Sequence, residues 1–435
     1  MSSKIAQPLV KFTEIIRDND LVFDEELSRH NYVVKRFISL VNKVPDSRRQ
    51  KKIVYPMKEI LLIAFFAVLS GAQTWTQIAM YGAQEHSWLR NFLKFENGTP
   101  SHDTFRRVFS LIKPEILQTL TVDFLMNNMK QIKKALGIED VGMNLINVDG
   151  KQSTGTGKTS SKNGPIADIQ ILNVYDASHG ICIAMKDIDE KSNEIPAAQK
   201  ILRTLNLKNS VVTFDALNTQ KKTIAVITEQ GGDYVGALKA NHQLFYNEVK
   251  DYFSPDVLDK LRECGDTFYQ TVEVARKRKV CRNYYMTTDI KWFSDRSAWK
   301  KLKAFVCCEK TTTNLVTGET TTEMRYYISS VADVQLCGEA IRGHWSVENK
   351  LHWHIDVSFG DDDDTTSDKN AFMNFTQFRR LALTLLKMAQ PILKCSIKNM
   401  QWLSAMRPER NFGKMLNALD EKQLEEALRN AIVKK

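Results

Sequence analysis

The segment GHWSVENKLHW, residues 343–353, combines residue types that could carry out chemistry. It places one carboxylate, Glu348, between His344 and His352, with a spacing of four residues on each side. Residues four apart on an α-helix lie on the same face. Three interpretations are therefore open: a histidine metal site, a buried amphipathic turn, or the position of a single catalytic acid.

Zinc binding is one alternative for this segment. Two histidines on one helix face could hold the metal, but the HExxH pattern of many zinc enzymes is absent. Trp345 and Trp353 flank Glu348 and need apolar cover, which indicates a helix anchored in a core. We therefore predict no zinc site, and we interpret His344 as a candidate phosphate contact and His352 as a core histidine with satisfied hydrogen bonds.

Two aspartates far upstream offer partners for Glu348. Asp149 ends the predicted strand 143–149, and Asp215 lies at the end of the predicted strand 210–216. If the two strands are parallel neighbours, both acids lie at one edge of the sheet, exposed to a ligand. Two such acids suit magnesium or manganese, and Glu348 would complete a two-metal site as the third carboxylate. The open alternative is that each aspartate caps the next turn.

A glycine-rich stretch invites comparison with a phosphate-binding loop. The residues QSTGTGKT, 152–159, nearly match G-x-x-x-x-G-K-[ST], with Lys158 and Thr159 in register. Gln152 stands where the leading glycine belongs, and a loop follows where the motif needs a helix N-terminus facing the phosphates. We therefore predict a flexible basic connection between two strands and no ATP binding.

The elements that must position the acids form an α/β region. Three predicted strands are followed by alternating helices and strands, which is the order that an RNase H-like core needs. A β-rich stretch, about 267–332, interrupts this core before the helix that carries Glu348 begins. We predict a catalytic domain over residues 140–380, followed by amphipathic helices over residues 381–435.

The first part of the chain is predicted to be helical, with a segment over residues 1–45 and a second region over residues 46–136. Arg106 and Arg107 lie in its helix SHDTFRRVFSLI, where short helices and tight turns resemble a helix-turn-helix arrangement. The second region is thus a candidate for binding nucleic acid. The open alternative is an ordinary helical bundle whose arginines are solvated.

Composition agrees with a polyanionic partner. The 435 residues carry a formal net charge of +10, and Lys and Arg gain by displacing the counterions condensed on phosphates. The 7 cysteines include no CxxC pair, which favours a reducing cytosol over a disulfide framework. The longest apolar run, residues 60–69, is too short to span a bilayer, so we predict a buried helix and no membrane partner.

Several long blocks carry a resemblance to a known family. They are INVDGKQSTG, DEKSNEIPAAQKIL, VVTFDALNTQKKTIAVITEQGGDYVGALKANH and IRGHWSVENKLHWHIDVSF. These blocks, spread over about 140–380, resemble the DDE transposases of the ISAs1 family, including the H-repeat-associated proteins, within the wider IS4-like group. The stretch from SRRQKK to RRVFSLI resembles the N-terminal domain associated with that family.

The resemblance implies a site and an activity. Matched residue by residue, the family's acidic triad falls on Asp149, Asp215 and Glu348, the positions that the strand and helix pattern also selects. It implies an RNase H-like domain that uses two Mg²⁺ (or Mn²⁺) ions and cuts DNA as an endonuclease at terminal inverted repeats. The released 3′-OH would then attack target DNA, with a homodimer on DNA in the bacterial cytoplasm. A regulator that no longer cuts and a nuclease that only hydrolyses remain as alternatives.

The sequence departs from the wider group around the glutamate. Relatives often carry Tyr-x2-Arg-x3-Glu-x6-Lys, and here His344 occupies the arginine position, with Ile341 and Ile355 at the tyrosine and lysine positions. Asp356 is the next candidate for the third acid, and the run Asp361 to Asp364 is predicted to be a solvated acidic loop. Candidate DNA contacts, each with solvent exposure as the alternative, are Lys151, Lys239, Arg342, His344, Asn349, Lys350, Arg106 and Arg107.

Overall fold

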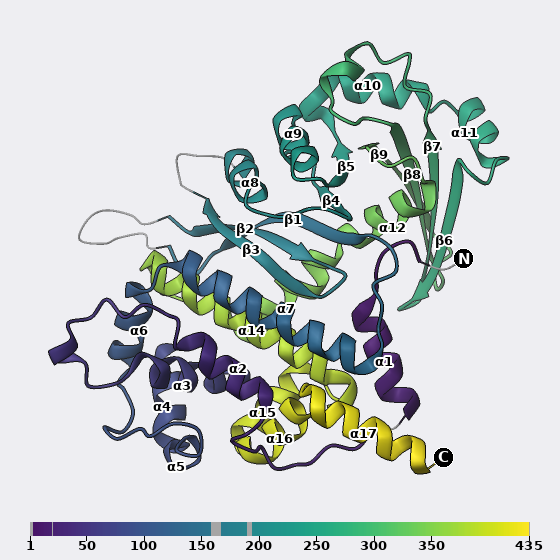
Figure 1. Ribbon diagram of the computed structural model, residues 1–435. Helices are drawn as coiled ribbons and strands as arrows, with labels where there is room; N and C mark the ends of the chain where they lie inside the picture. Colours follow the sequence, from purple (N-terminus) through teal and green to yellow (C-terminus); the bar gives the residue numbers. More distant parts are fainter. Residues whose placement is uncertain (1–2, 20, 158–166, 189–193, 435) are drawn as a thin grey trace.

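The computed structural model describes residues 3–19, 21–157, 167–188 and 194–434, and it shows a mixed α/β architecture (Figure 1). The described strands form one 9-stranded sheet in the order β3-β2-β1-β4-β5-β9-β8-β7-β6. The strands are β1 (Asn144–Ser153), β2 (Ile169–Asp176), β3 (Ile181–Ile188), β4 (Ser210–Phe214), β5 (Asp233–Leu238), β6 (Phe268–Ala275), β7 (Arg278–Thr287), β8 (Ala304–Asn314) and β9 (Thr320–Ser329).

Strands β1 to β5 follow the predicted order of elements. β1, β2 and β3 pair antiparallel, while β1, β4 and β5 pair parallel. Parallel neighbours need a crossover connection, and helices α8 (Glu194–Leu202) and α9 (Lys221–Glu229) lie between β3 and β4 and between β4 and β5. The prediction of a mixed sheet with alternating helices is confirmed.

The β-rich stretch extends this sheet. β9 pairs antiparallel with β5, Val235 opposite Ser329, and β8, β7 and β6 follow outward in antiparallel order. The strands of this stretch join the sheet of the α/β core edge to edge (Figure 1).

Both faces of the sheet are covered because its strands are apolar on both sides. Ile146 and Val212 belong to the core shared with α8, α9 and α10 (Gln243–Tyr252). Their neighbours Leu145 and Val211 point the other way, into a core shared with α12 (Val334–His344). The sheet is therefore buried between helices at the strands that carry Asp149 and Asp215.

The remaining helices form one body beside β2 and β3. Residues of the first 138 positions and residues after Val347 share a single hydrophobic cluster, so the helical stretches at the two ends of the chain pack together. The predicted buried helix is α3 (Met57–Leu69), in which almost every residue is buried. The other described helices of this body are α1 (Pro8–Asn19), α2 (Tyr32–Val41), α4 (Trp75–Gln84), α5 (His86–Leu89), α6 (His102–Leu111), α7 (Pro114–Leu136), α13 (Trp353–Phe359), α14 (Lys369–Leu393), α15 (Ile397–Met406), α16 (Pro408–Asn417) and α17 (Glu421–Lys434). The small helix α11 (Pro255–Arg262) lies by β7.

The helix predicted to carry Glu348 is not continuous. α12 ends at His344, and a π-helical turn, Glu348–His352, leads into α13. The end of α12 lies close to the sheet at Gly343, where an added Cβ would meet Cδ2 of Leu145 at 2.2 Å. Trp345 and Trp353 are 39% and 54% exposed, so the prediction that both need apolar cover is wrong.

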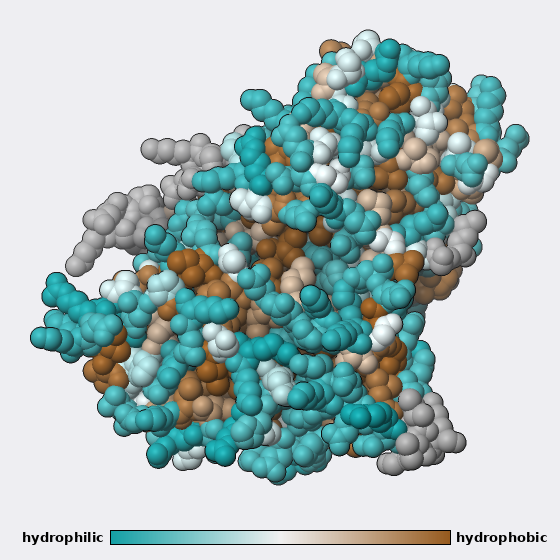
Figure 2. All heavy atoms as spheres, viewed as in Figure 1, coloured by the Kyte–Doolittle hydropathy of each residue, from teal (hydrophilic) through white to brown (hydrophobic). Residues whose placement is uncertain are grey.

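The viewed surface is mostly hydrophilic, as is typical of a globular protein. Figure 2 shows hydrophilic residues over most of the viewed face, with hydrophobic residues visible between them. Among the described residues, no helix has the length and apolar character required to cross a membrane.

Candidate active site

Asp149 and Asp215 lie next to each other where the pairing of β1 with β4 ends. β1 continues to Ser153 by pairing with β2, so the prediction that Asp149 ends its strand is wrong. The parallel register pairs Val148 of β1 with Phe214 of β4, so the residues that follow are the two aspartates. Both line a cavity of about 420 Å³ that also contains Glu348, from the turn after α12. The fold thus brings together three acids that are far apart in the sequence.

The electrostatics of this cavity favour a cation. Burial raises the pKa of Asp149 to about 7, and the negative charges of Glu194, Glu348 and Asp215 contribute to the same shift. Carboxylate oxygens are the ligands that Mg²⁺ and Mn²⁺ prefer, so the residues present fit such an ion.

Glu194 is a fourth carboxylate that the sequence pattern did not select. Its Oε1 accepts a hydrogen bond of 2.6 Å from Nδ2 of Asn218, which also lies 3.3 Å from Oδ1 of Asp215. A Cβ on Gly150 would meet Oε2 of Glu194 at 2.8 Å, so the end of this side chain lies against the backbone next to Asp149. The sequence signal for it was an acid at the start of α8, in a block that carries the family resemblance.

His352 is tied to Asp149. Its Nδ1 lies 3.6 Å from Oδ2 of Asp149, and its Nε2 lies 3.2 Å from Nδ2 of Asn173. Arg380 donates hydrogen bonds of 2.7 and 3.2 Å to Oδ1 of Asn173, which leaves the Nδ2 group to donate to His352. Burial lowers the pKa of His352 to about 3, so the ring is neutral with its proton on Nδ1, facing Asp149.

His344 lines the same cavity as the triad. Its Nδ1 lies 2.9 Å from Oγ1 of Thr213, on β4 two residues before Asp215. Burial lowers the pKa of His344 to about 4, against a smaller opposing effect of Asp215. A neutral ring therefore stands where relatives of the wider group carry a cationic arginine.

Lys151 does not face the cavity as a free cation. Its Nζ lies 2.7 Å from Asp356, 2.8 Å from Asp362 and 3.4 Å from Asp361, and only 6% of its side chain is exposed. The oxygens of these three aspartates lie within 4.8 Å of one another, and the ammonium group of Lys151 offsets part of their negative charge. Asp356 is thereby engaged away from the triad, whereas Glu348 lines the cavity.

The acidic run is not a solvated loop, so that prediction is wrong. Asp361 is 0% exposed and Asp364 is 7% exposed. Arg379, itself fully buried, lies 2.8 Å from each of them, and Oγ of Ser153 donates a further hydrogen bond to Asp361. Ion pairs with a cation from a later helix therefore allow these acids to be buried. The run of four aspartates does not by itself reveal this pairing.

Of the other predicted phosphate contacts, only Lys239 lines the cavity of the triad. Lys239 is exposed and lines its wall. Arg342 forms a two-pronged ion pair with Glu273, with contacts of 2.8 and 3.1 Å. Asn349 and Lys350 are exposed in the π-helical turn. Arg106 and Arg107 are exposed on α6, in the helical body and outside this cavity.

A basic hollow lies next to the cavity. It has a volume of about 260 Å³ and shares Arg325 and Trp345 with the cavity of the triad. The guanidinium of Arg325 lies 5.1 Å from the ring centroid of Trp345. The hollow is lined by Arg282, Tyr284, Cys308, Lys310, Arg325, Tyr327, Ile341, Arg342, Trp345 and Asn349.

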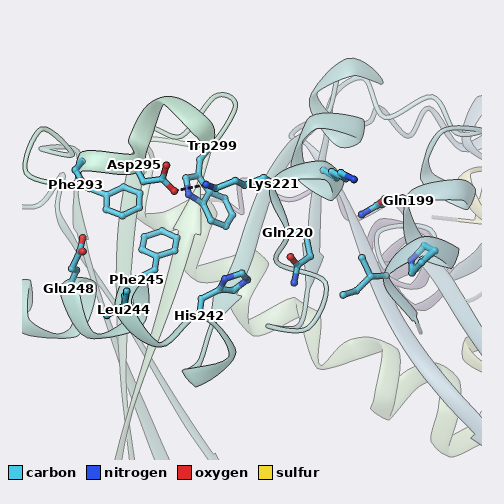
Figure 3. A pocket seen from close by; sticks show the side chains of 14 residues that line it. Gln199, Gln220, Lys221, His242, Leu244, Phe245, Glu248, Phe293, Asp295 and Trp299 are labelled. Carbon is cyan, nitrogen blue, oxygen red and sulfur yellow. Dashed lines mark ion pairs between the residues drawn. The ribbon is translucent and has the colours of Figure 1, made fainter. Parts of the chain in front are cut away.

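A larger cavity, about 830 Å³, lies beside α8 and α9 and contains none of the triad (Figure 3). Lys221 and Asp295 form an ion pair of 2.5 Å across it, close to Trp299. This cavity holds no group of acids comparable to the triad among its lining residues.

The glycine-rich stretch is described only as far as residue 157. Lys158 and Thr159, on which the comparison with a phosphate-binding loop rests, lie outside the described residues. The prediction of no ATP binding there stays a prediction.

The chain is similar to known transposases. The family "Transposase DDE domain" matches residues 142–385, and "DDE_Tnp_1-associated" matches residues 38–125. "Putative protein YbfL" of Escherichia coli K12 is 30% identical over 87% of this chain and 97% of that protein. "H repeat-associated putative transposase YhhI" of the same strain is 29% identical over the same shares. A cryo-EM structure of the piggyBac transposase synaptic complex with hairpin DNA aligns with 99% of this chain and 84% of that chain, at 12% identity and a TM-score of 0.34, too low to compare folds.

Proposed function

The chain belongs to the family of DDE transposases, and on this premise we propose that it cuts DNA at the terminal inverted repeats of an insertion sequence and joins the released ends to target DNA. Within the family we assign it to the ISAs1 group, on the blocks quoted from its sequence. Strands β3-β2-β1-β4-β5 would be the RNase H-like core, and β6 to β9 its insertion.

One observation supports this proposal above the others. Asp149, Asp215 and Glu348 line a single cavity, although they come from β1, from the end of β4 and from the turn after α12. Asp215 also caps the turn that follows it, because its Oδ1 accepts a hydrogen bond from the backbone N–H of Asn218. Turn capping alone gives an aspartate no reason to converge with a distant glutamate. Such convergence is what a carboxylate site for divalent metal requires.

The triad would hold two Mg²⁺ or Mn²⁺ ions. When bound, these ions polarise the phosphate and stabilise charge on the attacking and leaving oxygens. The role of the chain is to present three carboxylates at one sheet edge and to keep them oriented. Asn218 holds Asp215 through its backbone N–H, 3.1 Å from Oδ1, and His352 lies against Asp149.

DNA would approach along the basic side of the cavity. Lys239 and Arg325 line its wall, and the hollow beside it adds Lys310 and Arg282. Arg106 and Arg107 remain candidates for contacts from the helical body. Because two ends must be held together for transposition, we propose a homodimer on DNA as the working form, in the bacterial cytoplasm.

A cleavage assay tests the proposal. The substrate is duplex DNA from the sequence that flanks the coding region, incubated with the protein and Mg²⁺. We expect nicking by the wild type, and we expect Asp149→Ala, Asp215→Ala and Glu348→Ala each to reduce it by ~10³-fold or more while leaving DNA binding largely intact. Asp363→Ala, at an exposed acid of the same region, is the matched control.

The products separate the alternatives. Joining of labelled ends to a second DNA indicates strand transfer, whereas cut DNA alone indicates a nuclease that only hydrolyses. Binding without metal-dependent nicking by the wild type would identify a regulator and refute the proposal.

A further inference from the structure

The buried amide of Asn147 has one orientation. Its Nδ2 lies 2.9 Å from the backbone oxygen of Gly343, 3.3 Å from that of His344 and 2.9 Å from Oγ of Ser346. Backbone oxygens can only accept hydrogen bonds, so the NH₂ group must face them. The Oδ1 of this fully buried side chain therefore points the other way, toward Thr213.

The orientation of Asn147 determines the hydroxyl of Thr213. The two residues are register partners on β1 and β4, and Oγ1 of Thr213 lies 2.8 Å from Oδ1 of Asn147. Because an amide oxygen has no hydrogen to give, the threonine must donate its only hydroxyl proton in this contact. Toward His344, the same oxygen can only accept.

The hydroxyl of Thr213 in turn determines the tautomer of His344. The contact of 2.9 Å between Oγ1 and Nδ1 requires a proton on Nδ1. Since burial holds the pKa of His344 near 4, the ring is neutral at pH 7 and Nε2 carries a lone pair. No described residue donates a hydrogen bond to this nitrogen, and it is not among the buried polar atoms without a partner. It is therefore open to the cavity that His344 lines.

We propose that Nε2 of His344 accepts a hydrogen bond from the oxygen that attacks phosphorus, first water and then the 3′-hydroxyl of the cut end. This inference rests on the proposed function and names a residue that touches a reacting atom. It replaces our interpretation of His344 as a phosphate contact, because an uncharged nitrogen without a proton cannot donate to a phosphate oxygen. Both attacking groups carry an O–H, so one acceptor serves both steps.

Metal binding by this nitrogen is the less suitable role. Mg²⁺ prefers oxygen ligands, which the triad supplies. An acceptor beside the triad would instead orient the attacking oxygen, and orientation has a measurable effect because a displacement of about 1 Å can cost about 100-fold in rate.

Two substitutions of His344 distinguish the roles of its two ring nitrogens. His344→Asn keeps an N–H near the position of Nδ1, for Thr213, but has no atom at the position of Nε2. His344→Gln reaches the position of Nε2 with an amide that can accept. We expect cleavage of the flanking duplex DNA to fall by about 100-fold in His344→Asn and by clearly less in His344→Gln. Unchanged cleavage in His344→Asn, or an equal loss in both variants, would overturn the inference.

A control and a binding measurement accompany the rates. His354 also has a lowered pKa, but it contacts Ser358 and does not line the cavity, so His354→Asn should leave the rate unchanged. Affinity of His344→Asn for the same DNA, measured without divalent metal, should match that of the wild type. If the affinity for DNA falls as much as the cleavage rate, His344 contacts a phosphate after all, and our inference is refuted.

The tautomer can be measured without any reaction. In the full-length protein with ¹⁵N-labelled histidines, the signals that disappear in His344→Asn should be those of a neutral ring protonated at Nδ1. A ring protonated at Nε2, or a charged ring at pH 7, would overturn the inference. This spectrum requires no DNA cleavage, so it tests the tautomer independently of the proposed function. The proposed function is refuted by a different result, namely that the wild type cuts no DNA with Mg²⁺.

Discussion

Nζ of Lys151 lies 2.7 Å from Oδ1 of Asp356, so the strand that carries Asp149 is tied to the helix that follows Glu348. The ammonium group also contacts Asp361 and Asp362 and is almost completely removed from solvent. This interaction holds two elements of the candidate site in one arrangement.

Lys151→Met should be strongly destabilising. It removes the cation and leaves three aspartates crowded together, and breaking a buried ion pair typically costs about 3–5 kcal/mol. We expect the free energy of unfolding, measured by denaturant titration, to fall by about that amount. Lys300→Met is the matched control, because Lys300 and Glu229 form an exposed pair whose removal should have little effect on stability. Equal effects of the two substitutions would contradict the buried network.

Asp149→Asn should make the metal-free protein more stable at neutral pH. The pKa of Asp149 is raised in the folded protein from 3.8 to about 7, so between these values the folded state binds more protons than the unfolded state. Stability of the wild type therefore falls as pH rises through this window, and the asparagine variant lacks this decrease. We expect a gain on the order of 4 kcal/mol at pH 8 and almost none at pH 4, from unfolding curves in buffer with chelator. A constant difference across pH would show that Asp149 is not perturbed.

Divalent metal should oppose that difference in stability. A ligand that binds only the folded state stabilises it by about 2.7 kcal/mol at a concentration 100 times its Kd. Addition of Mg²⁺ or Mn²⁺ should therefore raise the unfolding midpoint of the wild type, and Asp149→Asn and Asp215→Asn should respond much less. Metal-free buffer with added NaCl of equal ionic strength is the control. The same response in Asp149→Asn would place the ion elsewhere.

Lys239→Ala and Arg325→Ala should each weaken DNA binding in a salt-dependent manner. Both residues line the cavity, and removing one phosphate-binding cation reduces the slope of log K against log salt by about 0.9. We expect this change for duplex DNA of any sequence, measured by titration at several NaCl concentrations. Lys300→Ala should leave the slope unchanged, because Lys300 does not line the cavity. An unchanged slope for Lys239→Ala would show that Lys239 does not bind a phosphate of the DNA.

The strands that carry the aspartates were predictable because their signal is local. The apolar runs before Asp149 and Asp215 predict strands, and β1 and β4 follow these runs closely. Chain order and the family resemblance then indicated Glu348 as the third carboxylate of the site. Glu194 was not selected, because its closeness to Asp149 depends on how α8 packs beside Gly150.

Local sequence is sufficient to specify most of the segments that become strands and helices, since hydrophobic periodicity and turn residues act over a few positions. It did not specify where the first strand ends, because β1 continues past Asp149 to Ser153 by pairing with β2. The charge states and partners of the polar groups depend instead on the tertiary structure. Lys151 is paired because three aspartates from distant positions surround it, and His344 is neutral because burial disfavours its charged form, while Thr213 and Asn147 leave it one tautomer. Hydrogen bonds and burial between remote residues set these properties, and no local pattern encodes them.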